Sequence, residues 1–301
     1  MTDLQIAGFI CKTENTGEYD RELTVFTPER GFIKVYAKGA RRPNARYGSE
    51  AAPFTCGVFQ LGHGRMGNSC ILKSYTATHT FPAVADVPAH YALACYMISA
   101  VMDVSRKELP DRELFDLLLA GIYETERIGP ILPHRRIRNT DGELIPPGAV
   151  GRPIWLVKSG FEAKLASISG ILSLCLECAD CGRELPDNAR GDIIYDTDHS
   201  RGCRPLCAKC AANVGHSGSL LVIPPNVAAS LRYAAEAPSD RFASLPCPPA
   251  DSYLLMRSAE ATALSLASPK TKAALDYYRT LAFGKPGMPD ERTWNQKYGL
   301  A

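Results

Sequence analysis

Hydrophobic and polar residues alternate from residue 4 to about residue 77. A period of two is typical of strands that bury one face, so this part of the chain predicts a β domain. The tight turn at 27–31, Thr-Pro-Glu-Arg-Gly, combines a proline that fixes φ with a glycine that tolerates positive φ. The five predicted strands are 4–11, 22–27, 32–38, 54–61 and 69–77. Five short strands at this spacing predict a small barrel, for which the OB fold is the natural candidate.

From residue 88 the hydrophobic period lengthens to nearly four, which predicts helices. The first stripe is Tyr91, Cys95, Ile98 and Met102, and we expect it to face a core. A second helix is predicted over 111–128, with Leu114, Leu118 and Ile122 as its stripe. A Pro- and Gly-rich loop covers 129–160. Later helices are predicted from Phe161 to Leu172, running into the first cysteine pair, and then at 226–237, at 252–267 and from Ser268 to Phe283, with Ser268 as cap and Pro269 in the first turn.

The order of these elements predicts an α+β multidomain protein. The expected parts are an N-terminal five-stranded OB-fold barrel over 1–80, a helical domain over 81–174 and 214–301, and a four-cysteine zinc module over 175–213 inserted between its halves. The chain of 301 residues has 46% hydrophobic residues, which is enough for such cores. No window resembles a membrane span or a secretory signal, so we expect a cytoplasmic location.

Eleven cysteines is a high and odd number, which in a cytoplasmic chain favours metal ligation over disulfides. Two C-x₂-C pairs, Cys178 with Cys181 and Cys207 with Cys210, have the spacing at which both thiolates of a pair can reach one ion. Gly182 suits the tight turn after the first pair. The sequence therefore predicts one structural zinc ion on these four cysteines.

Four nearby residues leave the ligand set open: Cys175, Cys203, His199 and His216. Cys175 continues a hydrophobic helix stripe and is interpreted as a packing residue, while the other three remain alternative ligands. Four thiolates would close the coordination shell and leave no position for a catalytic water, which disfavours a zinc hydrolase. A deaminase is excluded because no histidine has the required glutamate two residues later.

A G-x-G-x-x-G sequence at 62–67 lies between two predicted strands. A dinucleotide site needs a helix after this motif, so we interpret it as a hairpin loop. Neither a phosphate-binding P-loop motif nor a catalytic triad order is apparent.

Residues 30–49 contain six basic side chains and no acidic one, although the formal charge of the whole chain is only +2. The alternation places Phe32, Lys34, Tyr36 and Lys38 on the outer face of one strand. Rings on which bases can stack and cations that contact phosphates are what single-stranded DNA requires. An ordinary solvated barrel face is the alternative. The predicted DNA-binding residues are Lys34, Tyr36, Lys38, Arg41, Arg42 and Arg46.

Several separate segments resemble the bacterial recombination and repair family RecO. They are Gly17-Glu-Tyr-Asp20, Thr24-Val-Phe-Thr-Pro-Glu-Arg-Gly31, Ala37-Lys-Gly-Ala-Arg-Arg42, Phe161-Glu-Ala-Lys-Leu165 with Gly170, and the two cysteine pairs. The resemblance implies an OB fold, a helical domain and a zinc module. It also implies a protein that is not an enzyme and that binds single- and double-stranded DNA and anneals complementary strands. With RecR, such a protein helps to load RecA onto DNA coated by single-strand-binding protein.

The resemblance further implies that the acidic C-terminal tail of single-strand-binding protein is a partner, and that the protein works at the nucleoid. Arg127, Arg135, Arg136 and Arg138 cluster beside a hydrophobic helix and are candidates for that tail. The alternative function is an adaptor with an OB fold and a zinc ribbon that binds RNA or ribosomes, because OB faces bind RNA equally well.

Overall fold

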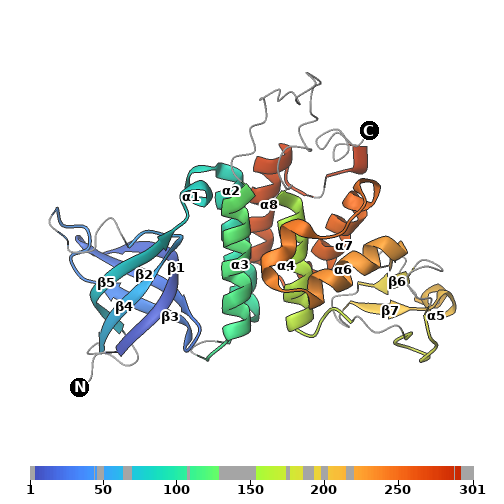
Figure 1. The fold of residues 1–301 in the computed structure, drawn as a ribbon, viewed down its shortest axis with the longest axis horizontal. Helices are drawn as coiled ribbons and strands as arrows, with labels where there is room; N and C mark the ends of the chain where they lie inside the picture. Colours follow the sequence, from blue (N-terminus) through green and yellow to red (C-terminus); the bar gives the residue numbers. More distant parts are fainter. Residues whose placement is uncertain are drawn as a thin grey trace.

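The computed structural model describes residues 4–43, 45, 51–63, 70–106, 109–128, 154–173, 177–185, 193–197, 203–214, 220–287 and 289–292. A β-barrel, a group of helices and a small sheet follow one another along the longest axis of the molecule (Figure 1). This order confirms the predicted fold class of an N-terminal barrel followed by helices and a four-cysteine cluster.

The barrel is closed, with the strand order β1-β2-β3-β5-β4. Its strands are β1 (Leu4–Thr16), β2 (Asp20–Thr27), β3 (Gly31–Ala37), β4 (Thr55–His63) and β5 (Cys70–Thr80). All neighbours are antiparallel except β3 and β5, which are parallel. Alternate residues fill the interior, among them Leu23, Val25, Ile33 and Val35. The predicted period of two is therefore confirmed. The prediction that a strand and not a helix follows the glycines at 62–67 is also confirmed, because β5 begins at Cys70.

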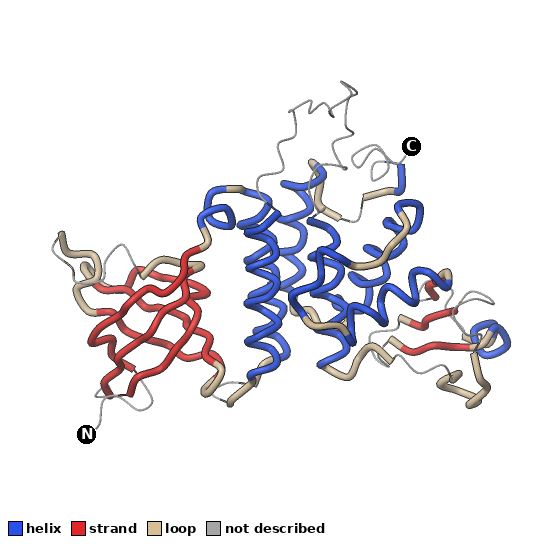
Figure 2. The backbone as a smooth tube through the Cα atoms, in the orientation of Figure 1, coloured by secondary structure: helices blue, strands red, loops and turns tan. Residues whose placement is uncertain are grey.

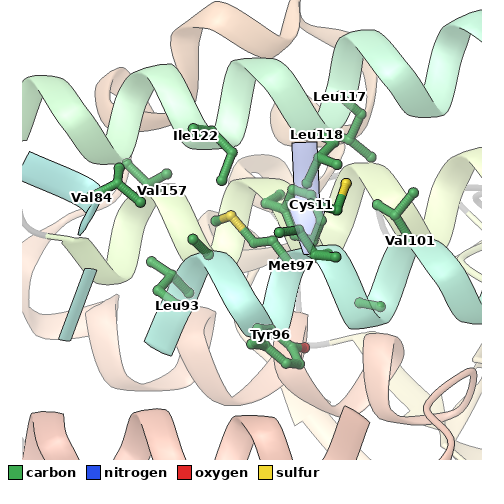
Figure 3. Packing of buried hydrophobic residues seen from close by; sticks show 14 of the residues in the cluster. Cys11, Val84, Leu93, Tyr96, Met97, Val101, Leu117, Leu118, Ile122 and Val157 are labelled. Atoms are coloured by element: carbon green, nitrogen blue, oxygen red, sulfur yellow. The ribbon is translucent and has the colours of Figure 1, made fainter. Parts of the chain in front are cut away.

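The helices form the middle of the molecule (Figure 2). They are α1 (Pro82–Asp86), α2 (Pro88–Val104), α3 (Arg112–Ile128), α4 (Ile154–Ile168), α6 (Pro225–Glu236), α7 (Ser252–Leu264) and α8 (Pro269–Phe283). Two 3₁₀ turns, Ser239–Ser244 and Pro249–Asp251, join α6 to α7. Figure 3 shows Met97 of α2, Leu118 of α3 and Val157 of α4 meeting in one core, which also receives Cys11 from the barrel.

A third, smaller layer is the sheet β7-β6-β8, formed by β6 (Ile193–Asp196), β7 (Arg204–Leu206) and β8 (Leu220–Ile223). A short helix, α5 (Ala208–Ala212), follows β7. Strand β8 pairs with β6, so this sheet extends beyond residue 213. Within the described residues, no helix is long and apolar enough to cross a membrane.

Two predictions about helix bounds are wrong. Helix α4 begins at Ile154, inside the predicted loop, and ends at Ile168 instead of continuing through Leu172. Gly170, with φ +68°, stops it, because the amide of Ile171 then donates back to the carbonyl of Ala166. Leu172 forms instead an isolated β-bridge with Cys203.

The stripe predicted as the core face of α2 is only partly buried. Tyr91 and Met102 are 42% and 39% exposed, whereas Leu93, Met97 and Val101 are completely buried. Helix α2 is surrounded by α1, α3 and α8, so hydrophobic residues occur around most of its circumference and the sequence period does not single out one face.

Candidate nucleic-acid interface and metal centre

The four predicted metal ligands come together in the described part of the chain. One ligand atom from each of Cys178, Cys181, Cys207 and Cys210 lies within 4.8 Å of the others. The Sγ atoms of Cys181 and Cys207, which belong to different pairs, are 3.7 Å apart. Four thiols at this separation can hold one metal ion.

The first cysteine pair lies on a tight hairpin. The amide of Cys178 donates to the carbonyl of Arg183 at 2.8 Å, and the amide of Gly182 donates to the carbonyl of Cys178 at 2.9 Å. Gly182 has φ +67°, a conformation that glycine adopts without steric cost, as the sequence predicted. The hairpin is attached to β7 because the amide of Ala179 donates to the carbonyl of Pro205 at 3.0 Å.

The second pair lies where β7 turns into α5. Cys207 precedes the first residue of α5, and Cys210 is in its first turn. Burial would raise the pKa of the Cys178 thiol, but hydrogen bonds from backbone amides, including that of Cys207, outweigh it and lower the pKa to about 6. The amide of Cys210 lowers the pKa of Cys207 in the same way. Both shifts move these two thiols toward the thiolate form that binds metal.

Cys203 lies outside this cluster. It is buried among hydrophobic residues, and burial raises the pKa of its thiol to about 12. The described residues therefore favour Cys203 as a packing residue. Cys175, His199 and His216 lie outside the described residues.

The predicted DNA-binding residues occupy two parts of the barrel. Lys34 and Tyr36 point outward from β3, whereas Lys38, Arg41 and Arg42 are on the turn that follows β3, and all three are exposed. Arg46 lies outside the described residues. The outward direction of Lys34 and Tyr36 agrees with the predicted alternation.

The outer face of the barrel around Lys34 and Tyr36, which we call the strand face, also carries acidic groups from the neighbouring strands. The sequence of residues 30–49 alone does not reveal them. Glu22 pairs with Tyr36 in the sheet register, and its carboxylate is 2.5 Å from the ammonium of Lys34. Hydrogen bonding to Lys34 lowers the pKa of Glu22. Glu14 of β1 lies opposite Glu22 and forms an ion pair with Lys12 at 2.6 Å. The strand face is therefore of mixed charge.

Phe32 does not extend the strand face as a stacking ring. Its ring stacks on Phe26 with centroids 4.1 Å apart and planes 6° apart, and it packs against the helical core. The sequence gives no signal for this, because only the tertiary arrangement places the helices against that end of β3.

Tyr19 is a candidate that the sequence reasoning missed. It lies in the β1–β2 turn with 42% of its surface exposed, and the guanidinium carbon of Arg42 is 5.4 Å from the centre of its ring. The Gly-Glu-Tyr-Asp segment at 17–20 carries part of the family resemblance, but nothing in the sequence indicated that the basic turn after β3 would lie beside it.

Of the predicted arginines for an acidic tail, Arg127 is described. It extends from the last turn of α3 and contacts the carboxylate of Glu124 at 2.8 Å. Arg135, Arg136 and Arg138 lie outside the described residues.

The protein has a closed five-stranded barrel, a helical domain and a four-cysteine cluster. These features place it in the class of OB-fold proteins with an appended cysteine-rich module. The family model described as "Recombination protein O N terminal" matches residues 1–81. The DNA repair protein RecO of Anaeromyxobacter dehalogenans (strain 2CP-C) is 27% identical over 215 residues, which are 71% of this chain and 73% of that protein.

Two further relatives are also DNA repair proteins RecO. The protein of Acetivibrio thermocellus is 26% identical over 71% of this chain and 72% of its own length. The protein of Rubrobacter xylanophilus is 25% identical over 79% of this chain and 82% of its own length. The family-model match and these relatives support the RecO family, which the resemblance in the sequence predicted.

Proposed function

We propose that this chain is a DNA-binding mediator of recombination and repair that acts without catalysis. It binds single- and double-stranded DNA through Lys34, Tyr36, Lys38, Arg41, Arg42 and Arg46. The observation that carries the proposal is the basic turn after β3, with Lys38, Arg41 and Arg42 exposed on an OB barrel. A positive surface concentrates two strands and screens the repulsion between their phosphates, which is sufficient to promote annealing.

The metal of the four-cysteine cluster is proposed to be one structural zinc ion. A tetrahedral ion with four zinc–sulfur bonds of about 2.3 Å has ligand atoms roughly 3.8 Å apart. The 3.7 Å between Cys181 and Cys207 agrees with that edge. Zinc supplies a cross-link between the two cysteine pairs, and the thiols at hand leave no position for a catalytic water.

The proposed partners are RecR and the acidic C-terminal tail of single-strand-binding protein, with which the protein would load RecA onto coated single strands. The proposed location is the cytoplasm, at the nucleoid. For the tail, an apolar surface beside Arg127 and the basic segment at 134–138 is the candidate. The support for these partners is the similarity of this chain to DNA repair proteins RecO.

The salt dependence of DNA binding tests the proposed interface. Each phosphate contact that is lost should reduce the slope of log affinity against log salt by about 0.7 for single strands. Lys38→Ala combined with Arg41→Ala should therefore flatten the slope by about 1.4 and slow annealing, with zinc content unchanged. Lys270→Ala with Lys272→Ala, on exposed residues of α8, is the matched control. If the double variant keeps the wild-type salt slope and affinity, the DNA-binding surface lies elsewhere.

The mediator role is tested by annealing complementary strands coated with single-strand-binding protein, with and without RecR. The wild-type chain should accelerate annealing, and RecR should change the rate. Competition between DNA and RNA single strands of equal length addresses the RNA-adaptor alternative. A strong preference for RNA, or metal-dependent turnover of either nucleic acid, would contradict the proposal.

A further inference from the structure

The β1–β2 turn and the turn after β3 lie at the same end of the barrel. Strands β1, β2 and β3 are successively antiparallel, so residues 17–19 and 38–43 meet at one end and the β2–β3 turn lies at the other. At that other end, a Cβ on Gly31 would lie 2.6 Å from the carbonyl oxygen of Leu109 in the α2–α3 connection. The first end is therefore the one remote from the helical domain (Figure 2).

Hydrogen bonds join the two turns into one corner. The amide of Arg41 donates to the carbonyl of Tyr19 at 2.9 Å, and Nη1 of Arg41 donates to the carbonyl of Glu18 at 3.1 Å. The amide of Gly39 donates to Oδ1 of Asp20 at 2.7 Å. Gly39 has φ +67°, which a side chain would strain. We call Tyr19, Lys38, Arg41 and Arg42 the Tyr19 corner.

The ring of Tyr19 is both fixed and accessible in this corner. The guanidinium of Arg42 lies 5.4 Å from the ring centre, within the range of a cation–π contact. The side chain nevertheless remains 42% exposed, and Arg41 and Arg42 are exposed beside it. A ring already held in place loses little conformational freedom when a base stacks on it.

The acidic groups are arranged differently on the strand face and in the corner. Tyr36 and Lys34 both interact with the carboxylate of Glu22, and hydrogen bonding to Glu22 raises the pKa of Tyr36. A nucleotide stacked on Tyr36 would bring its phosphates near that carboxylate. In the corner, the carboxylate of Asp20 accepts a hydrogen bond from the amide of Gly39. Glu18 is the exposed acidic residue there, and it is outnumbered by the three basic side chains of the corner.

We propose that Tyr19 is the main stacking ring of the barrel, that it takes an unpaired base, and that Arg41 and Arg42 hold the adjoining phosphates. Because bases inside a duplex already stack on each other, the corner favours single strands and strand ends over continuous duplex. This inference rests on the proposed DNA binding and adds to it the residue that distinguishes unpaired from paired bases.

Three single variants test the stacking role, with affinity measured for one single strand and for its duplex. Tyr19→Ala should weaken single-strand binding by roughly 5- to 140-fold, which corresponds to the loss of one stacked base, and leave the salt slope nearly unchanged. Its effect on duplex binding should be small. Tyr19→Phe keeps the ring and should bind nearly as the wild type does. Tyr36→Ala should weaken binding less than Tyr19→Ala.

Photocrosslinking of the wild-type chain gives a second measurement that does not depend on a variant. A single strand carrying 5-iododeoxyuridine should crosslink mainly to the peptide that contains Tyr19, identified by mass spectrometry. If Tyr19→Ala binds as the wild type does and crosslinks map to Tyr36, the inference is wrong while the proposed function stands. If Lys38→Ala with Arg41→Ala also has no effect, both are wrong.

Discussion

At the scale of single residues, cysteine has different roles in this chain that depend on its surroundings. Backbone amides lower the pKa of Cys178 and Cys207, whereas burial raises the pKa of Cys203 and Cys11. The first two are therefore shifted toward the thiolate form, and the last two behave as small hydrophobic residues. Pair spacing was enough to predict that Cys178, Cys181, Cys207 and Cys210 come together. It could not exclude Cys203, because its burial depends on the bridge to Leu172.

Serine and alanine variants separate ligand from packing cysteines. Cys178→Ser should lose stoichiometric zinc and give unstable protein, because metal binding is coupled to folding of the module. Cys203→Ala is the matched control: it should keep about one zinc per chain and lower the free energy of unfolding only by the loss of a small buried side chain. Elemental analysis and urea unfolding give both quantities. Retention of zinc by Cys178→Ser, or its loss from Cys203→Ala, would contradict the ligand set.

A buried ionic cluster in the helical domain predicts a pH dependence of stability. Lys158 of α4 contacts Glu162 at 2.7 Å and Glu260 of α7 at 2.6 Å. Tyr96 of α2 donates to Glu162 at 2.7 Å, and Arg279 of α8 pairs with Glu260. Burial raises the pKa of Glu162 to about 7, despite the opposing effect of Lys158, whereas Lys158 and Arg279 outweigh burial and lower the pKa of Glu260.

The two glutamates therefore act in opposite directions. In the folded state Glu162 stays protonated at pH values above 4.5, the ordinary pKa of a glutamate. The stabilising contribution of protonated Glu162 is therefore complete below pH 4.5 and is lost as pH rises through about 7. That loss is on the order of 3 kcal/mol. Glu162→Gln should flatten the fall in unfolding free energy over this range, and Glu113→Gln, exposed on α3, should not. An equal fall in wild type and Glu162→Gln would contradict the assignment.

At the scale of elements, periodicity predicted most helices and all five barrel strands. Helix α8 follows the prediction closely: Ser268 Oγ accepts the amide of Thr271, and the helix ends at Phe283. Strands β6 and β8 were missed, because each has only four residues and neither shows a clear period. The start of α4 was missed because the preceding prolines and glycines suggested a longer loop. Short elements are defined by tertiary pairing, which local sequence does not contain.

The end of α4 depends on one glycine. Gly170 has φ +68° and nothing within 4 Å of an added Cβ, so Gly170→Ala tests backbone strain alone. We expect a loss of about 1 kcal/mol in unfolding free energy, since alanine disfavours the left-handed conformation. Ser169→Ala, at the adjacent position, removes a hydroxyl that bonds to the carbonyl of Leu165 and is the control for local change. A Gly170→Ala variant at least as stable as the wild type would show that α4 does not end on this conformation.

At the scale of the whole molecule, the barrel and the helices share a hydrophobic interface. Phe9 of β1 contacts Phe81, Phe54 contacts Tyr91 of α2, and Phe26 of β2 contacts Phe115 of α3. The carboxylate of Glu126 also accepts the amides of Ala83 and Val84 at the start of α1. An interface this apolar favours two domains that move together. The sequence indicated both domains but could not indicate that these aromatic residues would join them.

Phe32 and Tyr36 differ in role although both lie on the outer face of β3, and one pair of variants separates the two roles. Phe32 stacks on Phe26 at the interface with the helices, so Phe32→Ala should lower the unfolding free energy by about 3 kcal/mol. At a temperature where the variant is folded, its affinity for single strands should equal that of the wild type. Tyr36→Ala removes a partly exposed ring and should leave stability nearly unchanged.

Urea unfolding gives the unfolding free energy of each variant, and titration with a single strand gives its DNA affinity. Because Phe32 belongs to the interface, its loss should also shift the unfolding of barrel and helices together, which near-ultraviolet and far-ultraviolet circular dichroism can follow separately. A Phe32→Ala variant of wild-type stability and reduced DNA affinity would place its ring on the DNA surface instead. Separate transitions for barrel and helices in the wild type would show that the aromatic interface does not couple them. If the proposed interface is correct, the position of a ring along β3 decides its role: the end next to the helices stabilises the molecule, and the end next to the Tyr19 corner binds DNA.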